Sequence, residues 1–360
     1  MSDQVHEHYM TRALELARRA SFTSPNPKVG CVLVRDGEVL GEGHHAGAGS
    51  PHAEIEALRR AGAAAGATAY VTLEPCHHHG RTPPCVPALI DAGISRVVVA
   101  AGDPDPRVSG AGIGALAEAG VEVLSGVCES AARTLNRAYN HHRVTGRPFV
   151  SLKLALSLDG RLAAPDRSGR WITGPGARTA VQRRRVEVDA VVVGAGTALA
   201  DDPALTVRDV HPLRQPARVL VDSTGRTPAS ARLFEDGEVV VATTEAASHD
   251  AQTGWKEAGA EVLMLPRRPE GVDLGAMLDA LGRRDWLELY CEGGARLAGA
   301  LLKAELVDGL ELHYGSVLLG RGGPELAELG VTTIRDARRW RLLSSRSIGD
   351  DLLTSYERSR

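Results

Sequence analysis

The sequence predicts an α/β protein with two domains, and three observations support that prediction. The chain has 360 residues, which exceeds the size at which a single hydrophobic core usually stops growing. Short apolar runs alternate with segments of helical periodicity along most of the chain, a pattern typical of layered α/β sheets. A Thr-Gly-Arg-Pro turn at 145–148 interrupts the alternation, so we expect one domain at 1–146 and a second at 147–360.

The first half begins with a predicted helix at 5–20, because apolar side chains recur there at helical spacing. A Ser-Pro-Asn-Pro segment ends this helix. Two apolar runs around an Asp-Gly turn then predict a β-hairpin. The predicted elements of this half are hairpin strands at 31–34 and 38–41, helices at 53–61, 84–92 and 112–119, and strands at 69–72, 97–101 and 121–124.

The second half repeats the alternation after a helix that ends at 141–143. The predicted strands are 149–155, 190–193, 218–221, 239–243, 262–265 and 287–291, and the predicted helices are 177–186, 273–281 and 295–306. Turn-forming residues concentrate at 164–169 and 202–216. We find no internal repeat between the two halves.

Composition narrows the classes of partner. The formal net charge is −3 and aromatic residues make up 4% of the chain, so we expect a small-molecule partner and neither nucleic acid nor a membrane. The absence of a signal-peptide stretch or a spanning apolar run leads us to expect a cytoplasmic protein. Five cysteines, an odd number, favour metal or core roles over disulfides. The oligomeric state stays open, with a homo-oligomer compatible.

A set of metal-ligand residues lies in the first half. His52-Ala53-Glu54 opens a predicted helix, Cys76 follows a strand in Glu-Pro-Cys, and Cys85 lies beyond a loop. One imidazole and two thiolates leave a fourth tetrahedral position for water, as catalytic Zn²⁺ sites do. Glu54 could carry a proton from that water to a leaving nitrogen. We therefore predict a zinc-dependent deaminase, and a helix starting at Cys76 would favour its thiolate.

The pattern His-x-Glu followed by Pro-Cys-x-x-Cys is the known signature of zinc deaminases, and this chain departs from it at one point. Eight residues separate Cys76 from Cys85. The histidines at 77–79 in this loop could offer a replacement ligand, but substrate contact or exposure is favoured because contiguous side chains diverge. Two other hypotheses are a binding protein with structural zinc and a nucleic-acid base deaminase whose second half binds RNA, although the acidic charge opposes the latter.

Longer motifs resemble those of the bifunctional deaminase/reductase family of riboflavin biosynthesis over nearly the whole chain. These motifs lie at 23–31, 51–54, 74–85, 153–160, 171–173, 193–197, 200–203 and 292–294. The long loop between the two cysteines is typical of that family. The resemblance implies a cytidine-deaminase-like three-layer α/β/α domain, followed by a dihydrofolate-reductase-like α/β domain.

The resemblance also implies two reactions. The first domain would remove the 2-amino group of 2,5-diamino-6-(5-phosphoribosylamino)pyrimidin-4-one. The second would use NADPH to reduce the ribosyl chain to ribityl at its anomeric carbon, which gives 5-amino-6-(5-phosphoribitylamino)uracil.

The resemblance also implies roles for individual residues. It implies that Asn26 binds the pyrimidine ring of the substrate. The implied contacts at the ribosyl phosphate end are His78, Arg81 and Asp103. Asp105 stands where some relatives carry an amide, so its role stays open. The implied cofactor residues are Ala155, Trp171, Thr197, Asp201, Ser223, Gly293 and Gly294. The implied substrate residues of the reductase are Arg185, Leu205, Arg208 and Glu292.

Several features of the second half have two interpretations without the resemblance. A Gly-Ala-Gly sequence at 194–196 lacks the third glycine of a dinucleotide fingerprint, and Pro203 stops the helix that a Rossmann unit needs. Gly293-Gly294 could be a phosphate site or a tight turn. The arginines at 183–185 could clamp a phosphate or form a solvated helix face. Lys153 is a further candidate, as a catalytic or a paired lysine.

Overall fold

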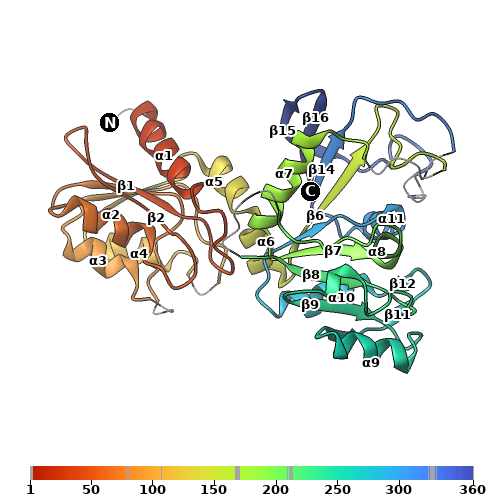
Figure 1. Ribbon diagram of the computed structural model, residues 1–360. Coiled ribbons are helices and arrows are strands. Elements are labelled where there is room, and N and C mark those ends of the chain that lie inside the picture. The colour runs from red at the N-terminus through yellow and green to blue at the C-terminus, as the bar shows by residue number, and fades with distance from the viewer. Residues whose placement is uncertain are drawn as a thin grey trace. The chain divides into compact units, whose positions relative to one another are not determined.

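The chain forms two compact units, Met1–Gly146 and Arg147–Arg360. The computed structural model describes residues 3–78, 80, 82–106, 108–166, 171–208, 210, 214–322, 324, 329 and 331–359. Each unit has its own β-sheet (Figure 1). Each also has its own hydrophobic core.

Unit 1 is built on a five-stranded sheet of order β2-β1-β3-β4-β5. Strand β1 pairs antiparallel with β2 and β3, whereas β3, β4 and β5 are parallel. Its elements are α1 (Asp3–Ala17), β1 (Gly30–Arg35), β2 (Glu38–His44), α2 (Ala53–Ala61), β3 (Thr68–Val71), α3 (Cys85–Asp91), β4 (Arg96–Val99), α4 (Ala111–Glu118), β5 (Glu122–Ser125), α5 (Glu129–Leu135) and α6 (Arg137–Thr145).

Helices cover both faces of this sheet because its strands are apolar on both sides. In β1, Cys31 and Leu33 pack into the core formed with α2, α3 and α4, whereas Val32 and Val34 pack against α1. Figure 1 shows α1 on one side of the sheet and α2, α3 and α4 on the other. Side chains of a strand alternate between faces, so this burial produces the expected three-layer α/β/α arrangement.

Glycines set two features of the β1–β2 hairpin that position the site. Asp36 and Gly37 have φ of 54° and 85°, so both central residues adopt the left-handed conformation that a two-residue turn requires. The predicted hairpin is confirmed. A Cβ on Gly43 would lie 2.1 Å from the carbonyl oxygen of Ala53, so the first turn of α2 packs against the strand only because this side chain is missing.

Unit 2 is built on a nine-stranded sheet of order β10-β9-β8-β7-β13-β6-β14-β16-β15, beside a two-stranded ribbon. The strands from β10 to β14 in this order are parallel, and β16 and β15 continue the sheet antiparallel. Its elements are β6 (Phe149–Leu156), α7 (Pro175–Glu187), β7 (Ala190–Gly194), α8 (Ala195–Asp201), β8 (Ala217–Val221), η1 (Arg232–Phe234), β9 (Val239–Thr243), α9 (His249–Glu257), β10 (Glu261–Met264), β11 (Arg267–Arg268), β12 (Gly271–Val272), α10 (Leu274–Gly282), β13 (Glu288–Cys291), α11 (Ala295–Lys303), β14 (Gly309–Tyr314), β15 (Trp340–Ile348) and β16 (Asp351–Arg358).

The parallel part of this sheet is also buried on both faces. In β7, Val192 belongs to the core formed with α10 and α11, whereas Val191 and Val193 belong to the core that contains Val181 of α7 and Trp255 of α9. Near-continuous valine runs are typical of parallel strands covered on both sides. Such runs explain why the sequence located β6 to β10 and β13.

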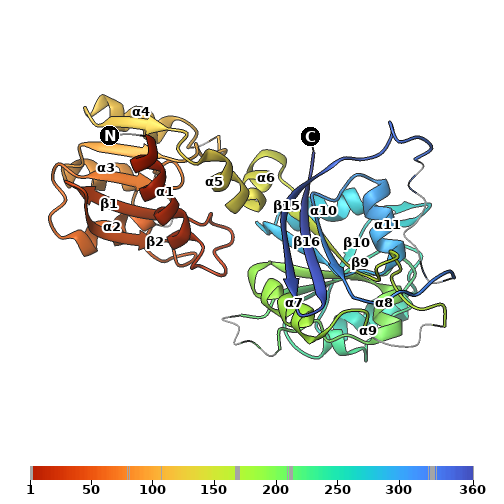
Figure 2. The same cartoon turned by 90° about the horizontal axis from the view of Figure 1, so that it is seen from above.

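The largest difference from the predicted elements lies after residue 306. Strands β14, β15 and β16 were not predicted, and Figure 2 shows β15 and β16 side by side at the C-terminal end. Most side chains of β15 are exposed, so no apolar run marks this strand. Helices α5, α8 and α9 were also missed, and α11 ends at Lys303 rather than 306. Within the described part of the chain, no helix is both long enough and apolar enough to cross a membrane.

Candidate functional site

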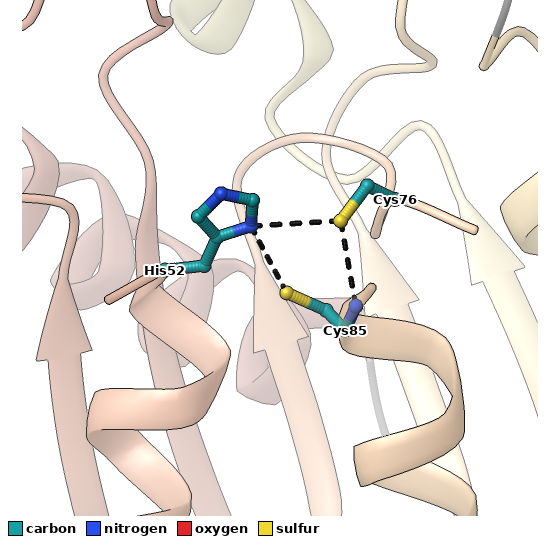
Figure 3. A group of neighbouring side chains, drawn as sticks. All are labelled: His52, Cys76 and Cys85. Atoms are coloured by element: carbon teal, nitrogen blue, oxygen red, sulfur yellow. Dashed lines mark hydrogen bonds between the residues drawn. The ribbon is translucent and has the colours of Figure 1, made fainter. Parts of the chain in front are cut away.

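Three potential metal ligands converge in unit 1 (Figure 3). His52 is the N-cap of α2, Cys85 is the first residue of α3, and Cys76 lies in the loop after β3. The Nδ1 atom of His52 lies 3.2 Å from Sγ of Cys85 and 3.5 Å from Sγ of Cys76. All three donor atoms lie within 4.8 Å of one another. One nitrogen and two sulfurs at this separation fit a tetrahedral Zn²⁺ ion with one open position.

The helix expected at Cys76 begins instead at Cys85, which corrects that prediction. The backbone N–H of Cys85 nevertheless donates to Sγ of Cys76 at 3.4 Å, so the Cys76 sulfur does face a helix N-terminus. Hydrogen bonds from the Cys85 thiol and from His52 lower the pKa of Cys76 to about 4. The pKa of Cys85 is raised because it hydrogen-bonds to the neighbouring thiolate. Thiolate is the form that binds metal.

Glu54 lies in the first turn of α2 and is 3% exposed. Burial raises the pKa of its carboxyl group, and the negative Cys76 nearby raises it further. A carboxyl group with a raised pKa accepts a proton more readily than a free carboxylate does, which suits a general base. The ring of His52 is also fixed, because its Nε2 lies 2.9 Å from the Thr82 hydroxyl while Nδ1 faces the sulfurs.

A cavity of about 280 Å³ opens in front of these residues. The predicted site residues among its lining are Asn26, His52, Glu54, Cys76, His78 and Asp103. Cys85 is fully buried. Arg81, predicted for the ribosyl phosphate end, lies outside the described residues.

Glu74 organises the loop on one side of this cavity, a role that the sequence did not reveal. Its two carboxylate oxygens accept backbone N–H groups of Asp103, Gly110, Gly112 and Ile113 at 3.0–3.3 Å. The loop after β3 therefore holds the segment that carries Asp103. The Glu-Pro-Cys motif contained this residue, but its partners lie 29 to 39 positions away along the chain.

His45 was also missed, and it orients Asn26. Its Nδ1 lies 3.1 Å from the carbonyl oxygen of Pro51, and its Nε2 lies 2.9 Å from Nδ2 of Asn26. A carbonyl oxygen only accepts, so Nδ1 carries the proton and Nε2 accepts from the Asn26 amide. Burial lowers the pKa of His45, which favours this neutral form. The amide oxygen of Asn26 is thereby directed away from His45.

In unit 2, four groups of predicted cofactor residues lie at the carboxyl ends of neighbouring parallel strands. Ala155 is on β6, Thr197 follows β7, Ser223 follows β8, and Gly293-Gly294 follows β13. The Thr197 hydroxyl accepts the N–H of Gly294 at 2.9 Å. Open α/β sheets bind ligands at this edge, so the placement suits a cofactor.

The two remaining predicted cofactor residues, Trp171 and Asp201, have exposed side chains. Trp171 is 59% exposed and stacks on the guanidinium of Arg178, whose carbon lies 5.0 Å from the ring centre. Asp201 is the last residue of α8 and is exposed. The structure leaves both as predictions.

The predicted substrate residues of the reductase gather around one ion pair. Arg185 of α7 binds Glu292 through two hydrogen bonds of 2.6 and 3.0 Å and donates to the carbonyl oxygen of Thr206 at 2.8 Å. Leu205 precedes Thr206 with a φ of 57°, and the N–H of Arg208 binds Gln182 of α7 at 2.8 Å. Left-handed backbone in a branched residue is a strain that often marks functional sites.

The ion pair is buried, and burial sets the charges around it. Burial opposes ionisation of Glu292, but the Arg185 charge outweighs it and lowers the pKa of Glu292. Burial also lowers the pKa of the nearby Lys153, against the pull of Glu292. A lysine with a lowered pKa gives up its proton more readily than a free lysine does.

The solvated-face interpretation of the arginines is wrong for two of the three. Arg185 is buried as described, and Arg184 binds Glu288 and lies 2.7 Å from Glu311. Tyr290 and His313 lie on the same polar face of the sheet, and both were missed. They come from β13 and β14, and only the strand order brings them beside α7.

Comparisons with known proteins identify both units. Residues 3–101 match the cytidine and deoxycytidylate deaminase zinc-binding region, and residues 148–354 match the RibD C-terminal domain. Fold and site together define a bifunctional enzyme, in which a zinc-binding deaminase domain precedes a reductase domain.

Full-length relatives then give the family. The riboflavin biosynthesis protein RibD of Escherichia coli (strain K12) is 44% identical over 96% of this chain and 97% of its own length. The solved structure of Acinetobacter baumannii RibD, form 1, superposes with a TM-score of 0.90 at 38% identity, with 100% of both chains covered. A diaminohydroxyphosphoribosylaminopyrimidine deaminase/5-amino-6-(5-phosphoribosylamino)uracil reductase from Thermotoga maritima gives a TM-score of 0.86 at 32% identity, with 99% of both chains covered. The chain belongs to the RibD family of riboflavin biosynthesis enzymes.

Proposed function

We propose that unit 1 deaminates 2,5-diamino-6-(5-phosphoribosylamino)pyrimidin-4-one and that unit 2 reduces the product with NADPH to 5-amino-6-(5-phosphoribitylamino)uracil. One observation carries the first half of the proposal. Glu54, Asn26 and two of the three converging ligands, His52 and Cys76, line one cavity of about 280 Å³, a volume near the lower end for small-molecule pockets. The third ligand, Cys85, is buried next to both. Unit 2 contributes a nicotinamide site at the carboxyl edge of its sheet.

In the deaminase, His52, Cys76 and Cys85 would hold Zn²⁺. When bound, Zn²⁺ lowers the pKa of a coordinated water and so supplies a nucleophile near neutral pH. Glu54 accepts a proton from the attacking water and returns it to the leaving amino nitrogen. Asn26 turns its amide oxygen toward the pyrimidine and accepts a hydrogen bond from a ring N–H. His78, Arg81 and Asp103 bind the ribosyl phosphate end.

In the reductase, the cofactor site is formed by Ala155, Trp171, Thr197, Asp201, Ser223 and Gly293-Gly294. NADPH, when bound, supplies a hydride to the anomeric carbon of the ribosyl chain. Lys153 gives a proton to the ring oxygen as the carbon–oxygen bond breaks. Arg185 holds Glu292 against the sugar, and Leu205 and Arg208 complete the contacts with the substrate.

A coupled assay tests this proposal. Zinc-loaded protein is given the diaminopyrimidine substrate, and ammonia release and NADPH oxidation are followed separately. We expect both signals, with ammonia first. Chelation of zinc should stop ammonia release and leave NADPH oxidation intact when the deaminated product is supplied directly. Ammonia without NADPH oxidation would leave unit 2 without the proposed activity, and no ammonia at all would exclude this substrate.

A further inference from the structure

Helix α6 places two side chains in the deaminase cavity that no motif had indicated. Tyr139 and Arg143 both line it. They are four residues apart, so they lie on one face of the helix. The guanidinium carbon of Arg143 lies 5.1 Å from the centre of the Tyr139 ring, a distance at which a cation and an aromatic ring attract.

Both side chains contact the loop held by Glu74. The Tyr139 hydroxyl donates to the Asp103 carboxylate at 3.0 and 3.2 Å. Arg143 lies 3.9 Å from the Asp105 carboxylate and donates to the carbonyl oxygen of Pro25 at 3.0 Å. Its side chain is 17% exposed and that of Asp105 is 6% exposed. Arg143 is therefore fixed from three directions and still borders the cavity.

The charged side chains that line the cavity are mainly acidic, so an anionic substrate needs a cationic side chain there. Glu54, Glu74, Asp103 and Asp105 all line it, and Arg143 is the only lysine or arginine among its described lining residues. A phosphorylated substrate brings two further negative charges into this acidic surrounding. A guanidinium held in place binds phosphate through paired N–H donors at little further entropic cost.

We propose that Arg143 is a further substrate-binding residue of the deaminase, which contacts the phosphate of the substrate from α6, on a different element from the loop that carries His78 and Arg81. This inference rests on the proposed function, because it takes a phosphoribosyl substrate for granted. Tyr139 and Asp105 position the guanidinium, and Asp105 thereby gains a role that the sequence had left open.

The test compares the phosphorylated substrate with its dephosphorylated riboside. For Arg143→Leu we expect KM for ammonia release to rise roughly ten- to a hundredfold with the phosphorylated substrate. The kcat should stay within about twofold of wild type, and KM for the riboside should not change. Arg143→Lys should recover part of the loss. Arg133→Leu, which removes an exposed arginine paired with Glu129, is the matched control.

Two further measurements keep the test decisive. The double variant Asp105→Asn/Arg143→Leu removes both charges of the pair. It is used in place of Arg143→Leu if that single variant does not fold. Calorimetric titration with ribose 5-phosphate and with ribose measures phosphate recognition independently of the deamination reaction. If wild-type protein releases no ammonia, only the proposed function is overturned, and the titration still tests Arg143. Equal losses with both substrates, or no weakening of ribose 5-phosphate binding in the variant, would overturn the role of Arg143.

Discussion

The two units build their sites in opposite ways. In unit 1 the proposed metal ligands and Glu54 lie between residues 52 and 85, at the start of two helices and in one loop. In unit 2 the candidate residues range from Lys153 to Gly294, and five of the predicted cofactor residues lie at the carboxyl ends of four neighbouring strands. Metal chemistry needs a few side chains of fixed type, whereas a nucleotide site uses backbone and shape from many segments. The first kind of site is therefore easier to recognise in a sequence.

The sharpest way to separate the two units is Glu54→Gln. We expect ammonia release to fall by roughly 10²–10⁴-fold, because the amide cannot carry the proton to the leaving nitrogen. NADPH oxidation with the deaminated product should remain at the wild-type rate, and zinc content by metal analysis should be unchanged. Full activity of the variant would instead favour a structural zinc site.

The matching change in unit 2 is Arg185→Met, which leaves Glu292 buried without its partner. Removal of one member of a buried ion pair costs about 3–5 kcal/mol, so we expect the urea unfolding transition of unit 2 to shift to lower concentration. NADPH oxidation should be lost while ammonia release continues. The double variant Arg185→Met/Glu292→Gln should regain stability without activity, and the comparison fails if unit 1 unfolds in parallel.

His313 gives unit 2 a pH dependence of stability. It is 4% exposed, and burial, with the nearby charge of Lys153, lowers its pKa from 6.5 to about 4. Between these values the unfolded chain binds a proton that the folded chain does not, so stability is complete above pH 6.5 and is lost as the pH falls toward 4. The loss is about 3 kcal/mol at most.

The check is the unfolding free energy of wild type and His313→Phe at pH 7 and pH 4.5. The variant should show a smaller difference between the two pH values. His249→Gln, at an exposed position of the same unit, serves as the control. An identical pH dependence in wild type and His313→Phe would contradict the prediction.

The smallest effect is expected for Tyr139→Phe. The ring that packs against Arg143 remains, and only the hydrogen bonds to Asp103 are removed. Loss of a hydrogen bond to a charged group costs about 1.5–3 kcal/mol, and water that enters the cavity can replace part of it. We expect KM for ammonia release to rise a few-fold, with kcat and NADPH oxidation unchanged. A fall in kcat alone would show that Asp103 acts in the chemical step.

The sequence by itself predicted the layered α/β class, most strands as far as Cys291, and the grouping of His52, Glu54, Cys76 and Cys85. These predictions depend on local signals. A run of valines marks a buried strand whatever its place in the sheet, and the type and order of the metal ligands stay recognisable although the loop between the two cysteines is longer than usual. The roles of the individual ligands and of Glu54 stay predictions until the variants are measured.

Only the tertiary structure decided which polar residues meet. Arg184 and Arg185 became buried partners of Glu311 and Glu292 because β13 and β14 lie on either side of β6, beneath α7. Tyr139 and Arg143 reached the deaminase cavity because α6 packs beside the loop that Glu74 holds. Neither meeting is encoded by spacing along the chain, since strand order and helix phase together set which side chains share a face.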